Sequence, residues 1–250
     1  MSRLSLLIRV LIGLAVTYGC HAMPARVTAA GVAVHEQCGV VFIIGGVGGM
    51  DLLGPAAQWA LPRAGIRHEV RDFVWTHGFG RVLKDLRDTP YLLMKAGELA
   101  AEVRRVKADN PDRPVYFVAK SGGTGVALAA AEMLLPATLE RIILLSAAVS
   151  PTYDLGRALQ ATKYEIVSFY SPLDCFVLGI GTSMFGTTDR VHTPSAGLRR
   201  FRLPADADEP ERVVQRSWRP AMILEGYAGN HCGTSMPLFI AKEVAPWLQP

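Results

Sequence analysis

The chain has 250 residues, of which 50% are hydrophobic and 8% aromatic, so it is long and apolar enough to bury one large core. Its formal net charge is +4, and the basic residues are scattered instead of forming a stripe with interleaved aromatic side chains, which argues against a nucleic-acid partner. Because no CxxC pair or histidine-rich spacing occurs, we expect no metal, and the chemistry proposed below needs no cofactor.

Residues 1–22 have the pattern of an export signal. Arg3 and Arg9 precede an apolar run from Val10 to Val16, and the small residues Gly19 and Ala22 suit cleavage. The apolar run is too short and too poorly flanked for a stable membrane span. The sequence therefore predicts an exported protein, periplasmic or extracellular, with residues 26–250 as a single domain.

The fate of the signal is open between three alternatives. Cleavage after Ala22 would release the protein, whereas the residues before Cys20 resemble a degenerate lipobox, which would make Cys20 the lipidated first residue. The signal could also stay uncleaved as an anchor. The second and third alternatives predict membrane association through the N-terminus.

The first strong strand signal is the continuous apolar run Val40–Ile44, as expected for a parallel strand covered on both faces. Weakly apolar residues 26–36 predict an additional edge strand before it. The run ends in a glycine-rich loop, residues 45–49. Loops at the carboxyl ends of strands are where open α/β sheets place their sites.

Two functions compete for this loop. Gly46 and Gly48, with Glu69 further on, match part of a dinucleotide-binding fingerprint, but Asp51 takes the position of its third glycine. The alternative is a loop whose N–H groups stabilise a developing oxyanion, with Val47 as the first candidate donor and Gly46 as the second. We favour the oxyanion loop.

Between this loop and residue 113, the pattern predicts one strand between two helices. We expect a helix over 52–64, a strand over 67–75 and a helix over 92–107, which Asn110 and Pro111 terminate. His77 follows the strand, and we expect it to be a structural loop histidine.

A strand over 114–120 then turns abruptly into an Ala-rich helix, and Ser121 lies at the turn. Such an elbow exposes a serine hydroxyl beside backbone N–H groups, which suits a nucleophile. Gly123 supplies one small residue of the G-x-S-x-G pattern, whereas Ala119 replaces its first glycine. Lys120 is expected to point to solvent. An ordinary glycine-rich connection or a weak phosphate loop is the alternative interpretation of this turn.

In the second half of the chain, Asp174 follows a predicted strand and His231 lies in a loop before the last helix. The predicted strands are 141–146, 164–170 and 218–225, and the predicted helices lie near 153–159 and over 235–248. Residues 176–216 show no clear periodicity, and we expect them to lie over the sheet edge or the site.

Ser121, Asp174 and His231 thus follow three strands in that order. Parallel strands joined by right-handed crossovers bring the three following loops to one edge of the sheet. There, a histidine can accept the serine proton while an aspartate orients the imidazole. Cys175 and Cys232 directly follow two of these residues, so a disulfide between them is conceivable, although small buried thiols are the favoured interpretation.

The order nucleophile, acid, histidine, with a glycine loop about 75 residues before the serine, resembles the α/β-hydrolase superfamily. The resemblance covers the chain from Cys38 to Leu248. Small lidless bacterial members, including a planctomycete-type group, are the most similar, through the stretches 75–78, 153–155, 169–174 and 179–182.

The resemblance implies a mostly parallel sheet flanked by helices, with little or no lid. It also implies a serine hydrolase that cleaves a small or lipid-like ester, with the N–H groups of Gly122 and Val47 as oxyanion donors. Cleavage of a thioester or an amide would use the same residues. The rival functions are a non-catalytic binding protein of the same fold and a dinucleotide-binding oxidoreductase.

Overall fold

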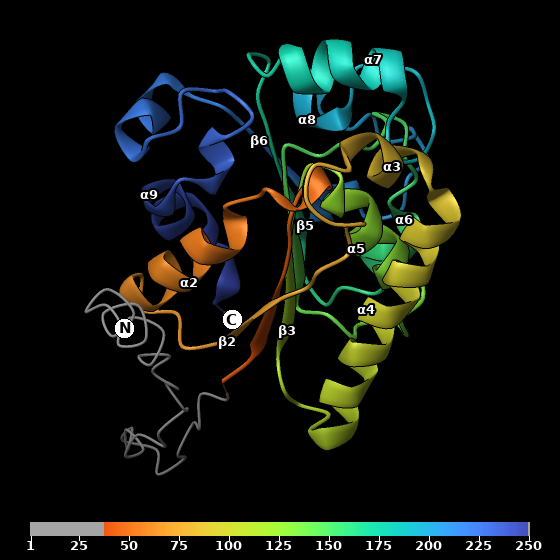
Figure 1. Ribbon diagram of the computed structural model, residues 1–250. Helices are drawn as coiled ribbons and strands as arrows, with labels where there is room; N and C mark the ends of the chain where they lie inside the picture. The colour runs from red at the N-terminus through yellow and green to blue at the C-terminus, as the bar shows by residue number, and fades with distance from the viewer. Residues whose placement is uncertain (1–37, 250) are drawn as a thin grey trace, which may run out of the picture. The chain divides into compact units, whose positions relative to one another are not determined.

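A sheet of six parallel strands organises residues 38–249, which are the residues that the computed structural model describes (Figure 1). The strand order is β2-β1-β3-β4-β5-β6. The strands are β1 (Val40–Ile44), β2 (Glu69–Asp72), β3 (Val115–Lys120), β4 (Arg141–Leu145), β5 (Ile166–Tyr170) and β6 (Val213–Ser217).

The four central strands consist of apolar runs because helices cover both of their faces. Every residue of β1 and β3 is buried, whereas the edge strands β2 and β6 are mostly half-buried or exposed. In the register of the sheet, Ala119 of β3 lies beside Ile44 of β1 on one side and Leu144 of β4 on the other. The carboxyl end of β3 is therefore at the centre of the sheet.

One face of the sheet is covered by α4 (Thr89–Asp109), α5 (Gly123–Ala131) and α6 (Gly156–Gln160). Phe42 and Phe117 belong to the apolar core on this face. Asp88 caps α4 by accepting a hydrogen bond from the N–H of Tyr91 at 3.1 Å.

The opposite face packs against α2 (Leu53–Arg63) and the C-terminal segment (Figure 1). Val41 and Tyr116 share this second core with Phe239 and Ile240. The C-terminal segment combines short helical types: α9 (Pro237–Phe239), η6 (Ile240–Val244) and η7 (Ala245–Leu248). The predicted closing helix is therefore present but irregular.

Short helices lie beyond the carboxyl ends of the strands. They are η1 (Val47–Gly49), α3 (Val82–Arg87), η2 (Phe176–Gly181), α7 (Thr182–Phe185), α8 (Ala196–Arg199), η4 (Pro220–Glu225) and η5 (Gly233–Ser235). A further short helix, η3 (Pro210–Arg212), directly precedes β6 at the amino end of that strand. The helices between β5 and β6 are all short, with six residues or fewer each, so this part of the described chain agrees with the expectation of a minimal lid.

The sixth strand differs from the prediction. We expected residues 218–225 to form it, but the strand is Val213–Ser217, within the stretch that we predicted to be irregular, and residues 220–225 form the short helix η4. Pro220 explains the helix, because proline has no N–H for a strand ladder but is well suited to the first turn of a helix. The predicted strand over 67–75 is also shorter, since β2 is Glu69–Asp72.

Two sequence predictions lie outside the described residues: the export signal with Cys20, and the additional strand over 26–36. Within residues 38–249, no helix is long and apolar enough to cross a membrane.

Candidate active site

Ser121 lies in the turn between β3 and α5 and has a backbone φ of 51°, in the left-handed region that a residue with a side chain rarely adopts. Backbone hydrogen bonds hold it there: its N–H donates to the carbonyl of Leu145 at 3.0 Å, and its carbonyl accepts the N–H of Thr124 at 3.0 Å. A strained φ that is fixed by its surroundings is typical of a functional position. The predicted elbow is therefore present, but Ser121 is only 5% exposed, where we expected the turn to expose it.

Two glycines let the chain pass through this turn. A Cβ on Gly123 would lie 2.3 Å from the carbonyl oxygen of Gly45, and a Cβ on Gly122 would lie 2.5 Å from Cγ1 of Val47. Gly123 therefore requires glycine, because the backbone of the loop after β1 approaches so closely, whereas at Gly122 the nearest atom belongs to a valine side chain. Ala119, by contrast, is fully buried within β3, where its methyl group is accommodated.

The glycine loop after β1 lies beside the serine. A Cβ on Gly46 would be 3.8 Å from Ser121 Oγ. The N–H of Gly46 already donates to Asp51 Oδ2 at 2.8 Å, whereas among the hydrogen bonds of residues 38–249 none uses the N–H of Val47 or of Gly122. Of the predicted oxyanion donors, Val47 and Gly122 are thus available and Gly46 is not.

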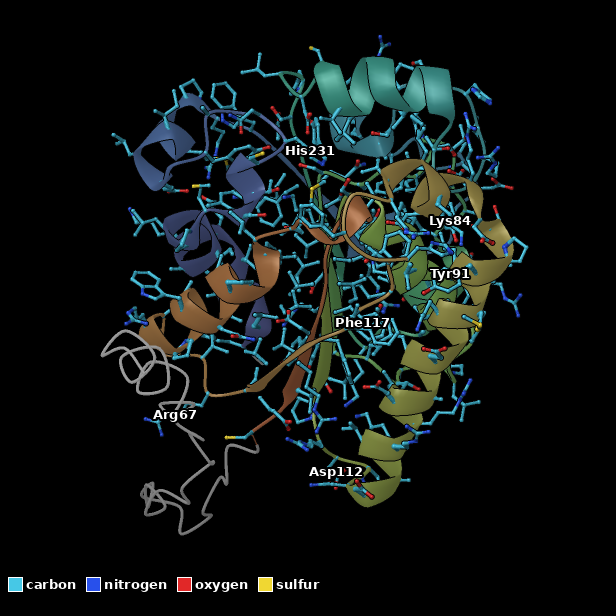
Figure 2. The ribbon with its side chains drawn as sticks, in the orientation of Figure 1. Arg67, Lys84, Tyr91, Asp112, Phe117 and His231 are labelled. Carbon is cyan, nitrogen blue, oxygen red and sulfur yellow. The ribbon has the colours of Figure 1, made fainter. Side chains whose placement is uncertain are left out.

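Asp174 and His231 are brought together at the same edge of the sheet, where Figure 2 labels His231. The Nδ1–H of His231 donates to Asp174 Oδ2 at 2.7 Å. The Asp174 side chain is 2% exposed and that of His231 17% exposed, so the carboxylate is buried behind an imidazole that reaches solvent. This arrangement fixes the ring and leaves Nε2 free of the carboxylate.

The third expected contact is absent. Among the hydrogen bonds of the described residues, none joins Ser121 Oγ to His231. Bonds between a nucleophile and its base are often long in the free protein and shorten only around a bound substrate. The structure thus pairs Asp174 with His231 and places the glycine loop beside Ser121, but it has no hydrogen bond between Ser121 and His231.

We expected Lys120 to point to solvent, but its side chain is buried. It is 5% exposed, and its Nζ donates to Ser235 Oγ at 2.7 Å and lies 3.3 Å from each carboxylate oxygen of Asp51. Burial alone would raise the pKa of Asp51, but the Lys120 ammonium and the N–H donors of Gly46 and Leu53 together hold that pKa below its ordinary value. Sequence reasoning missed this cluster because its members are up to 184 residues apart.

His77 has the structural role that we expected. Its Nδ1 bonds to Asp85 Oδ1 at 2.8 Å, and its ring stacks on Tyr91 with centroids 3.8 Å apart. The other oxygen of Asp85 accepts the N–H of Gly48 at 2.7 Å. His77 and Asp85 therefore support the glycine loop from the side of α3.

The cysteine prediction was correct in one respect and wrong in another. Cys175 and Cys232 are free thiols, as the favoured interpretation required, and they do not form the alternative disulfide, but both are exposed where we expected burial. They follow Asp174 and His231 on the outer side of their loops, where the chain has turned back towards solvent.

The same loop contacts argue against a dinucleotide site. A pyrophosphate needs free N–H groups, but Asp51 takes the N–H of Gly46 and Asp85 takes that of Gly48, and each carboxylate would repel an anion. Among the described residues no cluster of His, Cys, Asp or Glu has the geometry to hold a metal ion.

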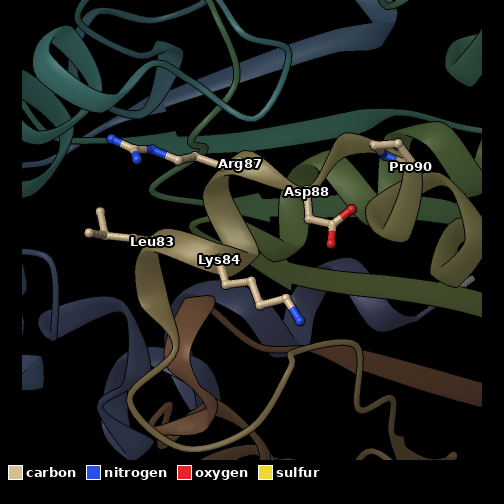
Figure 3. A pocket seen from close by; sticks show the side chains of 5 residues that line it. All are labelled: Leu83, Lys84, Arg87, Asp88 and Pro90. Carbon is tan, nitrogen blue, oxygen red and sulfur yellow. The ribbon is translucent and has the colours of Figure 1, made fainter.

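A surface pocket of about 450 Å³ lies away from these residues, along α3 and the start of α4 (Figure 3). It is lined by Leu83, Lys84, Arg87, Asp88 and Pro90. None of the predicted site residues lines it, so the chemistry of the site does not depend on this pocket.

Comparison with known proteins supports the fold but no closer relationship. No protein-family model and no curated protein sequence matches the chain. Among solved structures, an esterase from Pyrococcus furiosus is 10% identical, with a TM-score of 0.50 over 85% of this chain and 83% of its own.

Two further structures are similar at lower scores. A Thermus thermophilus protein is 13% identical, with a TM-score of 0.48 over 86% of this chain and 91% of its own. A Trichoderma reesei cutinase in complex with a phosphonate inhibitor is 13% identical, with a TM-score of 0.42 over 85% of this chain and 76% of its own.

Together with the strand order and the elbow, the comparison defines the class: this chain has the α/β-hydrolase fold. The similarity at 10% identity concerns the fold alone. The resemblance to the planctomycete-type group stays a prediction.

Proposed function

We propose that this protein is a serine hydrolase that cleaves a carboxylic ester through an acyl-enzyme. The observation that carries the proposal is the pairing of His231 with Asp174 at 2.7 Å, at the same sheet edge as a serine held at φ 51°. Two available N–H groups, those of Val47 and Gly122, lie beside that serine. Nucleophile, base, orienting acid and oxyanion donors are the parts that acyl transfer requires.

In the proposed reaction, Ser121 Oγ attacks the ester carbonyl while His231 Nε2 accepts the hydroxyl proton. Asp174 holds the Nδ1–H and stabilises the imidazolium that forms. The N–H groups of Gly122 and Val47 stabilise the negative oxygen of the tetrahedral intermediate. As the intermediate collapses, His231 returns the proton to the leaving alcohol, and a water activated by the same histidine then releases the acid.

Exposed apolar side chains on the surrounding loops favour an apolar acyl group. Met50 and Leu52 follow β1, Phe79 follows β2, and Leu173 follows β5, and each is at least half exposed. Because the carboxyl ends of parallel strands share one edge, these side chains form an apolar rim on the side of the sheet that carries Ser121. A small or lipid-like ester is the substrate class that such a rim suits.

The test is hydrolysis of 4-nitrophenyl acetate, butyrate and octanoate. We expect Ser121→Ala to lower kcat by at least about 10⁴-fold and Asp174→Asn by about 10³-fold or more, because the first removes the nucleophile and the second releases the imidazole from its orientation. Ser183→Ala, which alters an exposed serine of α7, should leave kcat unchanged. Equal kcat in wild type and Ser121→Ala, or no hydrolysis by the wild type, would refute the proposal.

We further propose that the protein is exported, as residues 1–22 predict. An N-terminal sequence of the protein recovered from cells distinguishes cleavage after Ala22 from processing at Cys20, and an intact N-terminus would indicate an uncleaved anchor.

A further inference from the structure

Lys120 is the last residue of β3 and directly precedes the proposed nucleophile, yet its charged end is directed into the protein. The residue is 5% exposed, and the Asp51 side chain is 10% exposed. The ammonium donates to Ser235 Oγ at 2.7 Å and lies 3.3 Å from both oxygens of Asp51. Its hydrogen-bonding capacity is therefore directed to protein groups, and Lys120 is not positioned to bind a substrate.

Asp51 connects this lysine to the glycine loop. Its Oδ2 accepts the N–H of Gly46 at 2.8 Å, and its Oδ1 accepts the N–H of Leu53 at 2.8 Å. Gly46 is the residue before Val47, the proposed oxyanion donor. The position of the Val47 N–H therefore depends on a carboxylate whose charge Lys120 balances.

Ser235 connects the same lysine to the histidine loop. Its hydroxyl accepts from Lys120 Nζ and donates to Asp51 Oδ1 at 3.1 Å. Ser235 ends η5, and it follows His231 by only four residues. One buried cluster, made of Lys120, Asp51 and Ser235, thus joins the three loops that carry the oxyanion donor, the nucleophile and the base.

Stability alone does not account for such a cluster, because the cost of removing two charges from water can exceed the attraction between them. We propose that Lys120 is a positioning residue, which sets the geometry of the oxyanion loop and the histidine loop relative to Ser121 through Asp51 and Ser235. This inference rests on the proposed ester hydrolysis. Without Lys120, the buried Asp51 loses its counter-charge. The hydrogen bond from Gly46 to Asp51 and the hydrogen bonds that fix Ser235 are then weakened at the same time.

The experiment measures kcat for 4-nitrophenyl butyrate per active site, with active sites counted as the fraction of protein that a fluorophosphonate labels. Counting active sites separates misfolding, which lowers their number, from misplacement, which lowers kcat at each one. We expect Lys120→Met and Asp51→Asn each to lower kcat per active site by about 10- to 100-fold with little change in KM, since small displacements of catalytic groups cost rates of this size.

Lys163→Met is the matched control. Lys163 also pairs with a carboxylate, Glu140 at 2.7 Å, but lies before β5 at the opposite end of the sheet. This variant should keep the wild-type kcat per active site.

Ser235→Ala is the second variant, for the case that Lys120→Met does not fold. It removes only the hydroxyl of Ser235 and leaves the charges of Lys120 and Asp51 paired. A drop in kcat per active site of about threefold or more supports the positioning role. Wild-type kcat per active site in Ser235→Ala, or in a folded Lys120→Met, would overturn the inference. A wild type that the fluorophosphonate does not label would instead refute the proposed function itself, so the two failures are distinguishable.

Discussion

At the scale of single residues, Gly123 has no room for a side chain. A Cβ there would lie 2.3 Å and 2.5 Å from the backbone carbonyl oxygens of Gly45 and Ile44, and backbone atoms cannot rotate away as a flexible side chain would. We expect Gly123→Ala to lower the free energy of unfolding by about 1–3 kcal/mol, measured by urea denaturation.

Gly97 is the matched control, because a Cβ there meets no atom within 4 Å and the residue lies inside α4. Gly97→Ala should raise the free energy of unfolding by about 0.5–1 kcal/mol, since alanine stabilises a helix interior relative to glycine. If Gly123→Ala were as stable as wild type, the close contact between the elbow and the glycine loop would be wrong.

The positions of some site residues could be predicted from the sequence, whereas the contacts of others could not. The positions of Ser121 and Asp174 after strands could be predicted, because β3 and β5 have clear apolar patterns and strand ends in a parallel sheet converge. His231 was placed after a predicted strand over 218–225, whereas the helix η4 separates it from β6. The catalytic roles of the three residues stay predictions.

The partners of Lys120 could not be predicted, since Asp51 is 69 residues away and Ser235 is 115. Nothing in the local sequence of Lys120 indicates a buried counter-charge.

At the scale of elements, the central strands could be predicted and the edges could not. The runs Val40–Ile44 and Ile142–Leu145 are apolar because both faces of the sheet are covered there, so both strands could be predicted from their sequences. Strand β6 is an edge strand that contains Gln215 and Arg216, so its sequence resembles a loop. The more apolar residues 220–225 were mistaken for it, although Ile223 and Leu224 are exposed.

At the scale of the whole molecule, the Asp51 cluster should make stability depend on acidity. In the folded protein, the pKa of Asp51 lies below its ordinary value of 3.8. The ionised Asp51 therefore contributes fully to stability at pH values well above 3.8. This stabilisation by Asp51 is lost as the pH falls from about 4 through the lower pKa that Asp51 has in the folded protein. We therefore expect the free energy of unfolding to decrease over this acidic range.

Urea denaturation at several pH values between about 2 and 6 measures this slope. Asp51→Asn should have a shallower slope than wild type over the same range, because the amide does not titrate, while the contribution of Glu69 and Glu165, whose pKa values are also lowered, is common to both proteins. Parallel slopes would show that the pKa of Asp51 is not shifted on folding.

The topology of the whole sheet follows from the sequence more directly than its chemistry does. Alternating strands and helices predict a parallel sheet, and the sheet order and the similarity to the Pyrococcus furiosus esterase agree with the α/β-hydrolase fold. The substrate depends on side chains of the loops beyond the strand ends, and residues 176–216 have no clear periodic pattern to interpret. Fold could therefore be predicted, while substrate choice could not.

The most direct test of an activated serine is intact-mass analysis after treatment with a fluorophosphonate, because this reagent needs no knowledge of the natural ester. We expect one adduct per wild-type molecule and none on folded Ser121→Ala or His231→Ala, since the first lacks the nucleophile and the second the base that activates it. A folded wild type that gains no adduct, or an adduct that persists in Ser121→Ala, would contradict the assignment of Ser121 as the nucleophile.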